Sequence, residues 1–371
     1  IEGQLISDVH LGGLLSGGVD SGIILAEMTR QNKKTKSFCA GFFEDVFDES
    51  GKAKSIANQI GSKHHTFSID LPSFEQIIEP MKRCDEPFSD TSMIPTYFLS
   101  SYTKEHVTVA LSGDGGDELF GGYPTYTADM VYQLFKFIPR VSFRFLGKII
   151  SYLPSAHNKV GFDYKIKALL KGLNYSYPEA HESWRRLFFD EEIDKLINDQ
   201  NNIFEYKKKS KLKIACHFWD DVSGCHYLDQ SMYVDLKTWL VDDILFKVDR
   251  MSMAHSLEMR APLLDHRIVE FAASLPIKFK KDILNSKKIL KHTSNKYFGL
   301  DYWSQQKKGF NAPMSRWINH YHEEFYEYLT RSDLFDKEQI SRLIDNHIKK
   351  REDNSFKICC LTSFVAWLES K

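Results

Sequence analysis

Two glycine-rich stretches decide the fold of this chain: Ser16-Gly17-Gly18-Val19-Asp20-Ser21 and Ser112-Gly113-Asp114-Gly115-Gly116-Asp117-Glu118. A short apolar run precedes each of them, at Leu11–Leu15 and at Val107–Leu111, and has the length of a buried strand. Open α/β sheets bind ligands at the carboxyl ends of their strands, and both turns are placed there. We therefore expect the two loops to bind one polyphosphate together with its magnesium ion.

Short apolar runs alternate with amphipathic segments over the first third of the chain, which is typical of a parallel sheet covered on both faces. The expected strands are Leu11–Leu15, Thr35–Phe42, His65–Ile69 and Val107–Leu111. The expected helices are Gly22–Gln31, a helix from an Asp48 N-cap to Ile60 that Gly61 ends, Ser73–Arg83 and Ser92–Lys104. Helical patterns dominate after Tyr123, so we expect an α/β core over residues 1–125 and a mostly helical region over residues 126–371.

Bulk properties exclude several classes of protein. The 371 residues exceed one typical core, which favours two domains. A net charge of -1 gives no broad attraction for nucleic acid or an anionic membrane, and no apolar run reaches the roughly 18 to 20 residues of a membrane span. The cysteines match no metal-binding spacing, which indicates reduced thiols and a cytoplasmic location.

The first loop has the residues of a phosphate cradle. Gly17 and Gly18 let backbone N–H groups approach an anion closely, and the following helix adds its positive N-terminal end. The hydroxyl groups of Ser16 and Ser21 can donate hydrogen bonds as well. Bare phosphate would repel Asp20, so we expect its carboxylate to bind magnesium.

The order S-G-G-x-D-S resembles the PP-loop of the ATP pyrophosphatase superfamily. It differs from G-x-x-x-x-G-K-[ST] and from G-x-G-x-x-G, the commoner nucleotide-binding loops. The resemblance implies cleavage of ATP to AMP and pyrophosphate and the adenylation of a carboxylate or a base. A plain serine-glycine turn is the alternative interpretation.

Four motifs in order resemble the C-terminal synthetase domain of glutamine-hydrolysing asparagine synthetases. They are Leu111–Tyr123, Arg250–Ala254, Ser256–Asp265 and Lys307–Phe310 with Pro313. The resemblance extends from near Leu5 to about Trp317. It implies a five-stranded parallel sheet flanked by helices, of the adenine nucleotide alpha hydrolase type, with a mostly helical C-terminal part.

The resemblance also implies roles for individual residues. Lys307 would stabilise charge on the α-phosphate, and a solvated lysine pair, Lys307-Lys308, is the alternative. Glu258 would assist proton transfer from the amine, whereas the alternative is an ion pair with Arg260. Asp114 would support formation of the acyl-adenylate, and Glu118 completes the catalytic set. The expected ATP-binding residues are Leu15, Ser16, Gly17, Gly18, Asp20, Ser21, Ala40, Gly41, Ser112 and Gly113.

Asp20 and Asp117 are two hard oxygen ligands on adjacent loops, suited to magnesium on the departing pyrophosphate. The expected cofactors are therefore ATP and Mg²⁺. The expected substrates are aspartate and ammonia, or glutamine through a glutaminase domain. The resemblance also allows a homodimer.

Glutamine-dependent members of the family begin with a glutaminase domain, and nothing in this sequence matches it. Either the chain is a fragment of a glutamine-dependent enzyme, which its abrupt start favours, or it receives ammonia from solution or a partner.

The acceptor acid is a second open point. The best-known asparagine-forming members carry an arginine before the second loop, and residues 85–96 contain none. The leading hypothesis is the conversion of ATP, aspartate and ammonia to asparagine, AMP and pyrophosphate. The alternatives are adenylation of another acid, in peptide or polysaccharide tailoring, and a non-catalytic interaction module.

Overall fold

The structure is a computed structural model that describes residues 1–32, 34–44, 46–139, 143, 162–198, 216–299, 302–303 and 311–371. The chain forms two compact units. Unit 1 contains residues 1–85, 90–123 and 235–313, and unit 2 contains residues 86–89, 124–234 and 314–371. The two units are described separately below.

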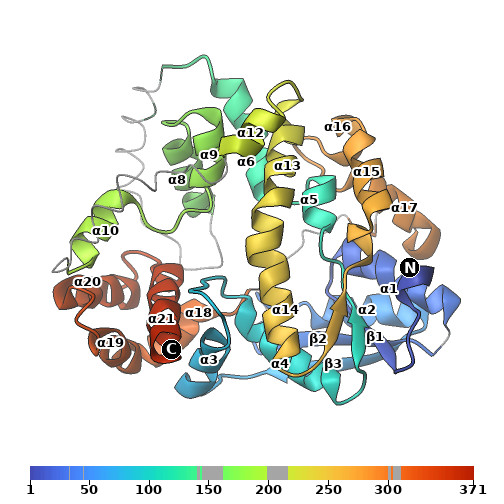
Figure 1. Cartoon of the computed structure of the whole chain (residues 1–371), viewed down its shortest axis with the longest axis horizontal. Coiled ribbons are helices and arrows are strands. Elements are labelled where there is room, and N and C mark those ends of the chain that lie inside the picture. Colours follow the sequence, from blue (N-terminus) through green and yellow to red (C-terminus); the bar gives the residue numbers. More distant parts are fainter. Residues whose placement is uncertain are drawn as a thin grey trace. The chain divides into compact units, whose positions relative to one another are not determined.

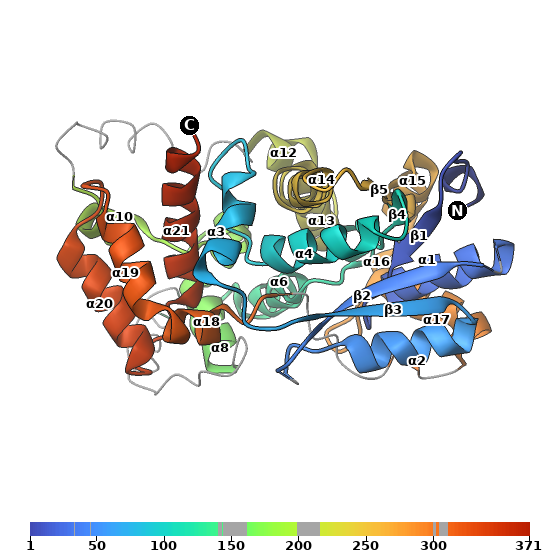
Figure 2. The ribbon, with the colours of Figure 1, turned by 90° about the horizontal axis from the view of Figure 1, so that it is seen from below.

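Unit 1 is built on a five-stranded, all-parallel sheet (Figures 1 and 2). The strand order is β3-β2-β1-β4-β5. The strands are β1 (Leu11–Leu14), β2 (Lys36–Phe42), β3 (Lys63–Ile69), β4 (Val109–Leu111) and β5 (Glu258–Arg260). This confirms the expected α/β class and places β1 next to β4, so the loops that follow these two strands leave the sheet side by side.

Helices cover both faces of this sheet, as a parallel sheet requires. Figure 2 shows α4 (Met93–Lys104) and α14 (Phe246–Met253) on one face, and α2 (Ser50–Ile60) and α17 (Lys288–Phe298) on the other. The other helical elements of unit 1 are η1 (Glu2–Gln4), α1 (Val19–Gln31), α3 (Phe74–Lys82), α5 (Gly116–Phe120), the π-helical η2 (Leu240–Leu245), η3 (Pro262–Leu264), α15 (His266–Ser274) and α16 (Ile277–Lys280).

Close packing of α1 on β1 fixes the start of the first loop. A Cβ atom at Gly13 would lie 2.7 Å from Leu25 Cδ2, so only glycine lets the helix approach this near. The N-cap of α1 is Gly18, and the helix therefore begins three residues earlier than the expected Gly22. Asp20 and Ser21 consequently lie in the first helical turn rather than in a free loop.

Helix α2 begins and ends by recognisable signals. Gly61 ends it in the left-handed conformation at φ +75°, as expected. The N-cap is Glu49, one residue after the expected Asp48. The Asp48 carboxylate nevertheless accepts a hydrogen bond from the Ser50 backbone N–H at 3.0 Å, so it supports the first turn from one position further out.

The domain boundary differs from the expected division at residue 125. The sheet unit indeed breaks at Tyr123, but residues 235–313 return to it instead of joining the helical region. The reason is β5, which pairs with β4 in the register Val109↔Glu258 and Leu111↔Arg260. A three-residue edge strand almost 150 positions beyond its partner leaves too short a pattern to be recognised as a strand.

Unit 2 is helical in the ranges that the structure describes, apart from an isolated bridge between Ile197 and Phe335. Its helices are α6 (Pro124–Phe135), α8 (Phe162–Gly172), α9 (Tyr177–Ser183), α10 (Asp190–Leu196), α12 (Cys216–Asp221), α18 (Met314–His320), α19 (His322–Thr330), α20 (Lys337–Ile348) and α21 (Ser355–Glu369); α13 (Tyr227–Lys237) starts in unit 2 and ends in unit 1. None of the helices in the described ranges has the length and apolar character needed to cross a membrane.

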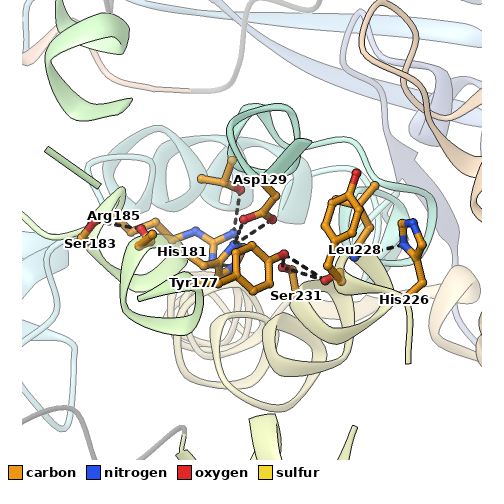
Figure 3. Close-up of polar contacts among 11 residues, drawn as sticks. Asp129, Tyr177, His181, Ser183, Arg185, His226, Leu228 and Ser231 are labelled. Carbon is orange, nitrogen blue, oxygen red and sulfur yellow. Dashed lines mark hydrogen bonds and ion pairs between the residues drawn. The ribbon is translucent and has the colours of Figure 1, made fainter. Parts of the chain in front are cut away.

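A buried polar network ties α6, α9 and α13 of unit 2 together (Figure 3). The fully buried Asp129 carboxylate lies 3.0 Å from His181 Nδ1, and Arg185 approaches the other ring nitrogen at 3.5 Å. Because arginine can only donate, His181 Nε2 accepts and Nδ1–H donates to Asp129. Tyr177 Oη lies 2.7 Å from Ser231 Oγ, which extends the network to α13.

We expect Asp129→Asn to lower the free energy of unfolding by roughly 3 kcal/mol, because it breaks a buried charged contact and leaves its partners less well paired. Urea-induced unfolding followed by circular dichroism measures the change. Asp221→Asn, at an exposed position of α12, is the matched control and should shift the midpoint very little. Equal midpoints for the two variants would contradict a stabilising role for the network.

Candidate active site

The first loop closes on itself through its two serines. Ser21 Oγ accepts a hydrogen bond from the Ser16 backbone N–H at 3.1 Å, and the two hydroxyl oxygens lie 3.0 Å apart. Ser16 Oγ also accepts from the Gly18 N–H at 3.2 Å. The loop is therefore a preformed turn that leads directly into the positive N-terminal end of α1.

The second loop is held by β5 and by its own side chains. The Ser112 N–H donates to the Arg260 carbonyl at 2.8 Å, which continues the ladder beyond β4. Ser112 Oγ donates to Asp114 Oδ2 at 2.6 Å. Gly115, at φ +87°, then turns the chain into the short helix α5, which carries Asp117 and Glu118 in its first turn.

The two loops touch each other, and glycine makes this contact possible. A Cβ atom at Gly113 would lie 2.7 Å from the Ser21 backbone nitrogen, and one at Gly116 would lie 2.5 Å from Asp20 Oδ1. Distances under 3.0 Å leave no room for any side chain at these two positions. The contact brings Asp20 and Asp117 to one point, as the sequence predicts for a shared ligand.

A lysine that the sequence analysis did not single out lies between these two carboxylates. The Lys287 ammonium contacts Asp20 Oδ2 and lies 2.7 Å from Asp117 Oδ1. Lys287 is 4% exposed and immediately precedes α17, with φ +54°. The other carboxylate oxygen of Asp20, Oδ1, is buried and has no hydrogen-bond partner among the described residues.

These residues fit a magnesium ion only in part. Asp20 and Asp117 supply hard oxygen ligands, and the Oδ1 atom of Asp20, which has no partner among the described residues, can ligate a metal. No group of three or more histidine, cysteine, aspartate or glutamate side chains in the described ranges could hold a metal ion. Mg²⁺ commonly binds one or two carboxylates and completes its shell with water and substrate phosphate, so the pair suits a metal that arrives with a nucleotide.

Two more lysines surround the first loop and give it a positive field. Burial lowers the pKa of Lys52 below its usual value, and the same cause together with the charge of Lys287 lowers that of Lys291. The ammonium group of Lys52 also lies 5.5 Å from the centre of the Trp303 ring. Lysines that repel one another in a partly buried space favour a polyanion as ligand.

The carboxyl group of Glu118 changes its protonation state near neutral pH. Burial and the neighbouring Asp117 carboxylate raise its pKa to about 7, although a 2.6 Å hydrogen bond from Tyr123 Oη partly opposes the shift. The side chain is 1% exposed. In this environment Glu118 can accept or donate a proton at physiological pH.

A second buried ion pair lies beside the second loop. Lys247 Nζ is 2.5 Å from Asp90 Oδ2 and 3.8 Å from Asp243 Oδ1. Burial alone would lower the pKa of Lys247, but Asp90, Asp243 and Asp114 together raise it. Lys247 is thus a cation paired with Asp90, and the sequence around Asp90, residues 85–96, contains no arginine.

The structure does not bring Glu258 to the two loops. Glu258 is the first residue of β5, whereas the loops follow the carboxyl ends of β1 and β4. Its half-exposed carboxylate accepts a 2.6 Å hydrogen bond from Arg260 Nε, which is the ion-pair alternative left open by the sequence. Arg260 is held in turn by the carbonyl groups of Gln4 and Ile6.

The remaining expected residues are placed as follows. Leu15 is buried at the end of β1, where its N–H donates to the Phe38 carbonyl at 2.8 Å. Ala40 and Gly41 lie near the carboxyl end of β2, beside β1. Lys307 falls outside the described residues, so its role stays a prediction.

Sequence reasoning missed Lys287, Lys247 and Glu49. Glu49 is 9% exposed and accepts a 3.4 Å hydrogen bond from the Gly17 N–H of the first loop. Isolated lysines and glutamates in helical segments are most often solvated, so nothing in their spacing separates these three from their neighbours. Lys287-Lys288 shows the difficulty, because only the first of the pair is buried.

The fold and the paired loops define an α/β protein with two glycine-rich loops at the carboxyl ends of adjacent parallel strands, which is where proteins of this class bind ligands. The family model described as Asparagine synthase matches residues 1–369, and the chain belongs to that family.

Curated relatives agree with this assignment. The chain is 28% identical over 97% of its length to "Asparagine synthetase [glutamine-hydrolyzing] 1" of Bacillus subtilis, of which the match covers 56%. It is 28% identical over 97% of its length to "Putative asparagine synthetase [glutamine-hydrolyzing]" of Mycobacterium bovis, of which the match covers 54%. A more distant relative is "Amidase chyE" of Penicillium rubens, at 23% identity over 85% of this chain and 51% of that protein. The chain thus spans about half the length of these relatives.

The raised pKa of Glu118 makes stability depend on pH. The unfolded carboxyl group has its usual lower pKa, so stability is fully present below about pH 4.5 and is lost as the pH rises through about 7. The loss amounts to about 3 kcal/mol.

We therefore expect Glu118→Gln to be more stable than the wild type at pH 8 and similar to it at pH 5. Urea denaturation at both pH values tests this, with the exposed Glu105→Gln as control. If the difference in stability between Glu118→Gln and the wild type is the same at pH 5 and at pH 8, the raised pKa of Glu118 is contradicted.

Proposed function

We propose that this chain is the synthetase part of an ATP-dependent amide ligase that adenylates a carboxylic acid and transfers the acyl group to ammonia. One observation carries the proposal: Asp20 and Asp117 come together where the two glycine-rich loops touch, and Lys287 lies between their carboxylates. Lys52 and Lys291 add positive charge near the same point. The cations at this site would neutralise the negative charge of a departing pyrophosphate. The names of the relatives support asparagine synthesis from aspartate, with ammonia from glutamine, as the leading reaction.

The proposed chemistry has two steps. An oxygen of the acceptor carboxylate attacks the α-phosphorus of ATP, the bond to the β-phosphate oxygen breaks, and pyrophosphate leaves. Ammonia then attacks the acyl carbon, loses a proton, and displaces AMP. The first step builds negative charge on phosphorus and on the leaving group, so it depends on cations and N–H donors already in place.

The residues of the first loop would bind the β- and γ-phosphates through backbone N–H groups and the hydroxyls of Ser16 and Ser21. Ser112 and Gly113 would contact the AMP part. Asp20 and Asp117 would hold Mg²⁺, which neutralises the pyrophosphate charge when bound. By family resemblance, Lys307 would stabilise the α-phosphate.

Lys247 is the cation that would recognise the acceptor. Its ammonium group is nine-tenths buried, and Asp90 is its one hydrogen-bond partner within the described residues. Because Asp114 of the second loop contributes to its raised pKa, Lys247 lies near the place where the acid would react. It would bind the non-reacting carboxylate of a dicarboxylic acid such as aspartate, in place of the arginine absent from residues 85–96.

Adenylation of a different acid remains the second candidate function. The observation in its favour is the composition of residues 85–96, which contain no arginine and whose Asp90 accepts a hydrogen bond from Lys247. The name "Amidase chyE" of one relative also differs from asparagine synthetase.

We expect Asp20→Ala and Asp117→Ala each to reduce pyrophosphate release from ATP at least 100-fold, because each removes a ligand of the metal on the leaving group. The assay contains ATP, Mg²⁺, ammonium and L-aspartate, and circular dichroism checks that the fold is intact. Asp70→Ala, at an exposed position after β3, is the control. Normal pyrophosphate release in either loop variant would refute the metal assignment.

A panel of acids tests the acceptor. We expect L-aspartate to stimulate pyrophosphate release, and Lys247→Met to raise the KM for aspartate about tenfold or more while leaving the KM for ATP unchanged, since a charged contact is lost. Release stimulated by a uronic acid or a peptide acid, and not by aspartate, would favour the second candidate function. An unchanged KM for the stimulating acid in Lys247→Met would exclude Lys247 from acceptor binding.

A further inference from the structure

The Lys287 ammonium group occupies the space between the two carboxylates that are the candidate metal ligands. It contacts Asp20 Oδ2 and lies 2.7 Å from Asp117 Oδ1, and its side chain is 5% exposed. A metal ion that bridged these same two oxygens would lie beside the ammonium group. Mg²⁺–oxygen distances are only about 2.1 Å, so a metal on the same two oxygens would lie within about 4 Å of the ammonium group, and the two cations would repel each other strongly.

The charges lead to the same conclusion. Two carboxylates and one ammonium carry a net charge of -1, which a divalent cation would turn into +1 at a buried site with Lys287 still in place. A buried excess of positive charge is unfavourable unless an anion accompanies it. The unpaired Oδ1 atom of Asp20, whose residue is 5% exposed, shows that one aspartate ligand position is not used by the lysine.

Glycine at position 122 is what admits the lysine side chain beside Asp117. A Cβ atom at Gly122 would lie 2.2 Å from Lys287 Cε and 1.9 Å from Asp117 Oδ1, so glycine at this position provides the space around the pair. Lys287 itself has a φ of +54°, which is uncommon for a residue with a side chain, and its backbone N–H donates to the Phe120 carbonyl at the end of α5. The backbone is thus fixed to α5, so a change of partner by the ammonium group has to come from rotation about the four side-chain torsions.

We infer that Lys287 is an internal counter-ion that a divalent metal displaces, and that the displaced ammonium group then pairs with the phosphates that arrive with the metal. The inference rests on the proposed function for the nucleotide, but the competition between lysine and metal does not. Lys287 would be a positioning residue that stabilises the two aspartates in the absence of ligand. It would also link metal binding to nucleotide binding.

Linkage makes this testable. Metal alone has to break two ion pairs of Lys287 and should bind weakly, whereas metal with a triphosphate offers the lysine new partners. Each ligand should therefore increase the affinity for the other by the same factor, within the usual range of about 5- to 150-fold.

The experiment measures Mn²⁺ binding to the whole chain by electron paramagnetic resonance, with and without a non-hydrolysable ATP analogue and without any acid. We expect Lys287→Met to bind Mn²⁺ alone about tenfold or more tightly than the wild type, and to lose most of the enhancement by the nucleotide. Lys288→Met is the matched control, because this neighbouring lysine pairs with Asp282 at the surface. The double variant Lys287→Met with Asp117→Asn should lose the gain in affinity.

Equal or weaker Mn²⁺ binding by a folded Lys287→Met variant would overturn the inference and leave Lys287 a structural ion-pair residue. If that variant does not fold, the measurement on the wild type is the test. A wild-type affinity for Mn²⁺ that the ATP analogue does not increase would also overturn the inference. Turnover is not measured, so tighter metal binding by Lys287→Met supports the inference even if no acid stimulates pyrophosphate release. In that case the proposed function alone would fail.

Discussion

Direct contact between the loops after β1 and β4 is the constraint on which the site depends. The parallel register of the two strands brings the loops to the same edge, and glycine at positions 113 and 116 removes the side chains that would separate them. Once the backbones touch, Asp20 and Asp117 are forced together. Two carboxylates this close need a cation between them, which Lys287 supplies.

Charge divides the site into two regions with different roles. Lys52, Lys287 and Lys291 gather around the first loop, where burial and mutual repulsion make a polyanion the favoured ligand. Beside the second loop Lys247 is set among acidic groups that raise its pKa. A triphosphate is a polyanion that several cations can stabilise, whereas a small acid can be bound by one cation. The distribution of charge in unit 1 therefore agrees with a ligase that binds both.

Membership of the asparagine synthase family extends over nearly the whole chain, yet the chain spans about half the length of the relatives it matches. The family explains why both glycine-rich loops are present together. It does not specify how the acceptor is recognised in this chain, where Lys247 and Asp90 form the ion pair that borders the second loop.

The sequence by itself determined the parallel α/β core and the position of its two ligand-binding loops. Short apolar runs such as Leu11–Leu15 and glycine turns such as residues 16–18 are local signals, which can be recognised in the sequence without knowledge of long-range contacts. Tertiary structure alone decided the three-residue strand β5, the return of residues 235–313 to the sheet, and the burial of Lys287 and Lys247. The sequence does not show whether the ammonium group of a lysine is surrounded by water or by carboxylates. Only long-range packing removes the water, and the removal of water gives these side chains their charged partners.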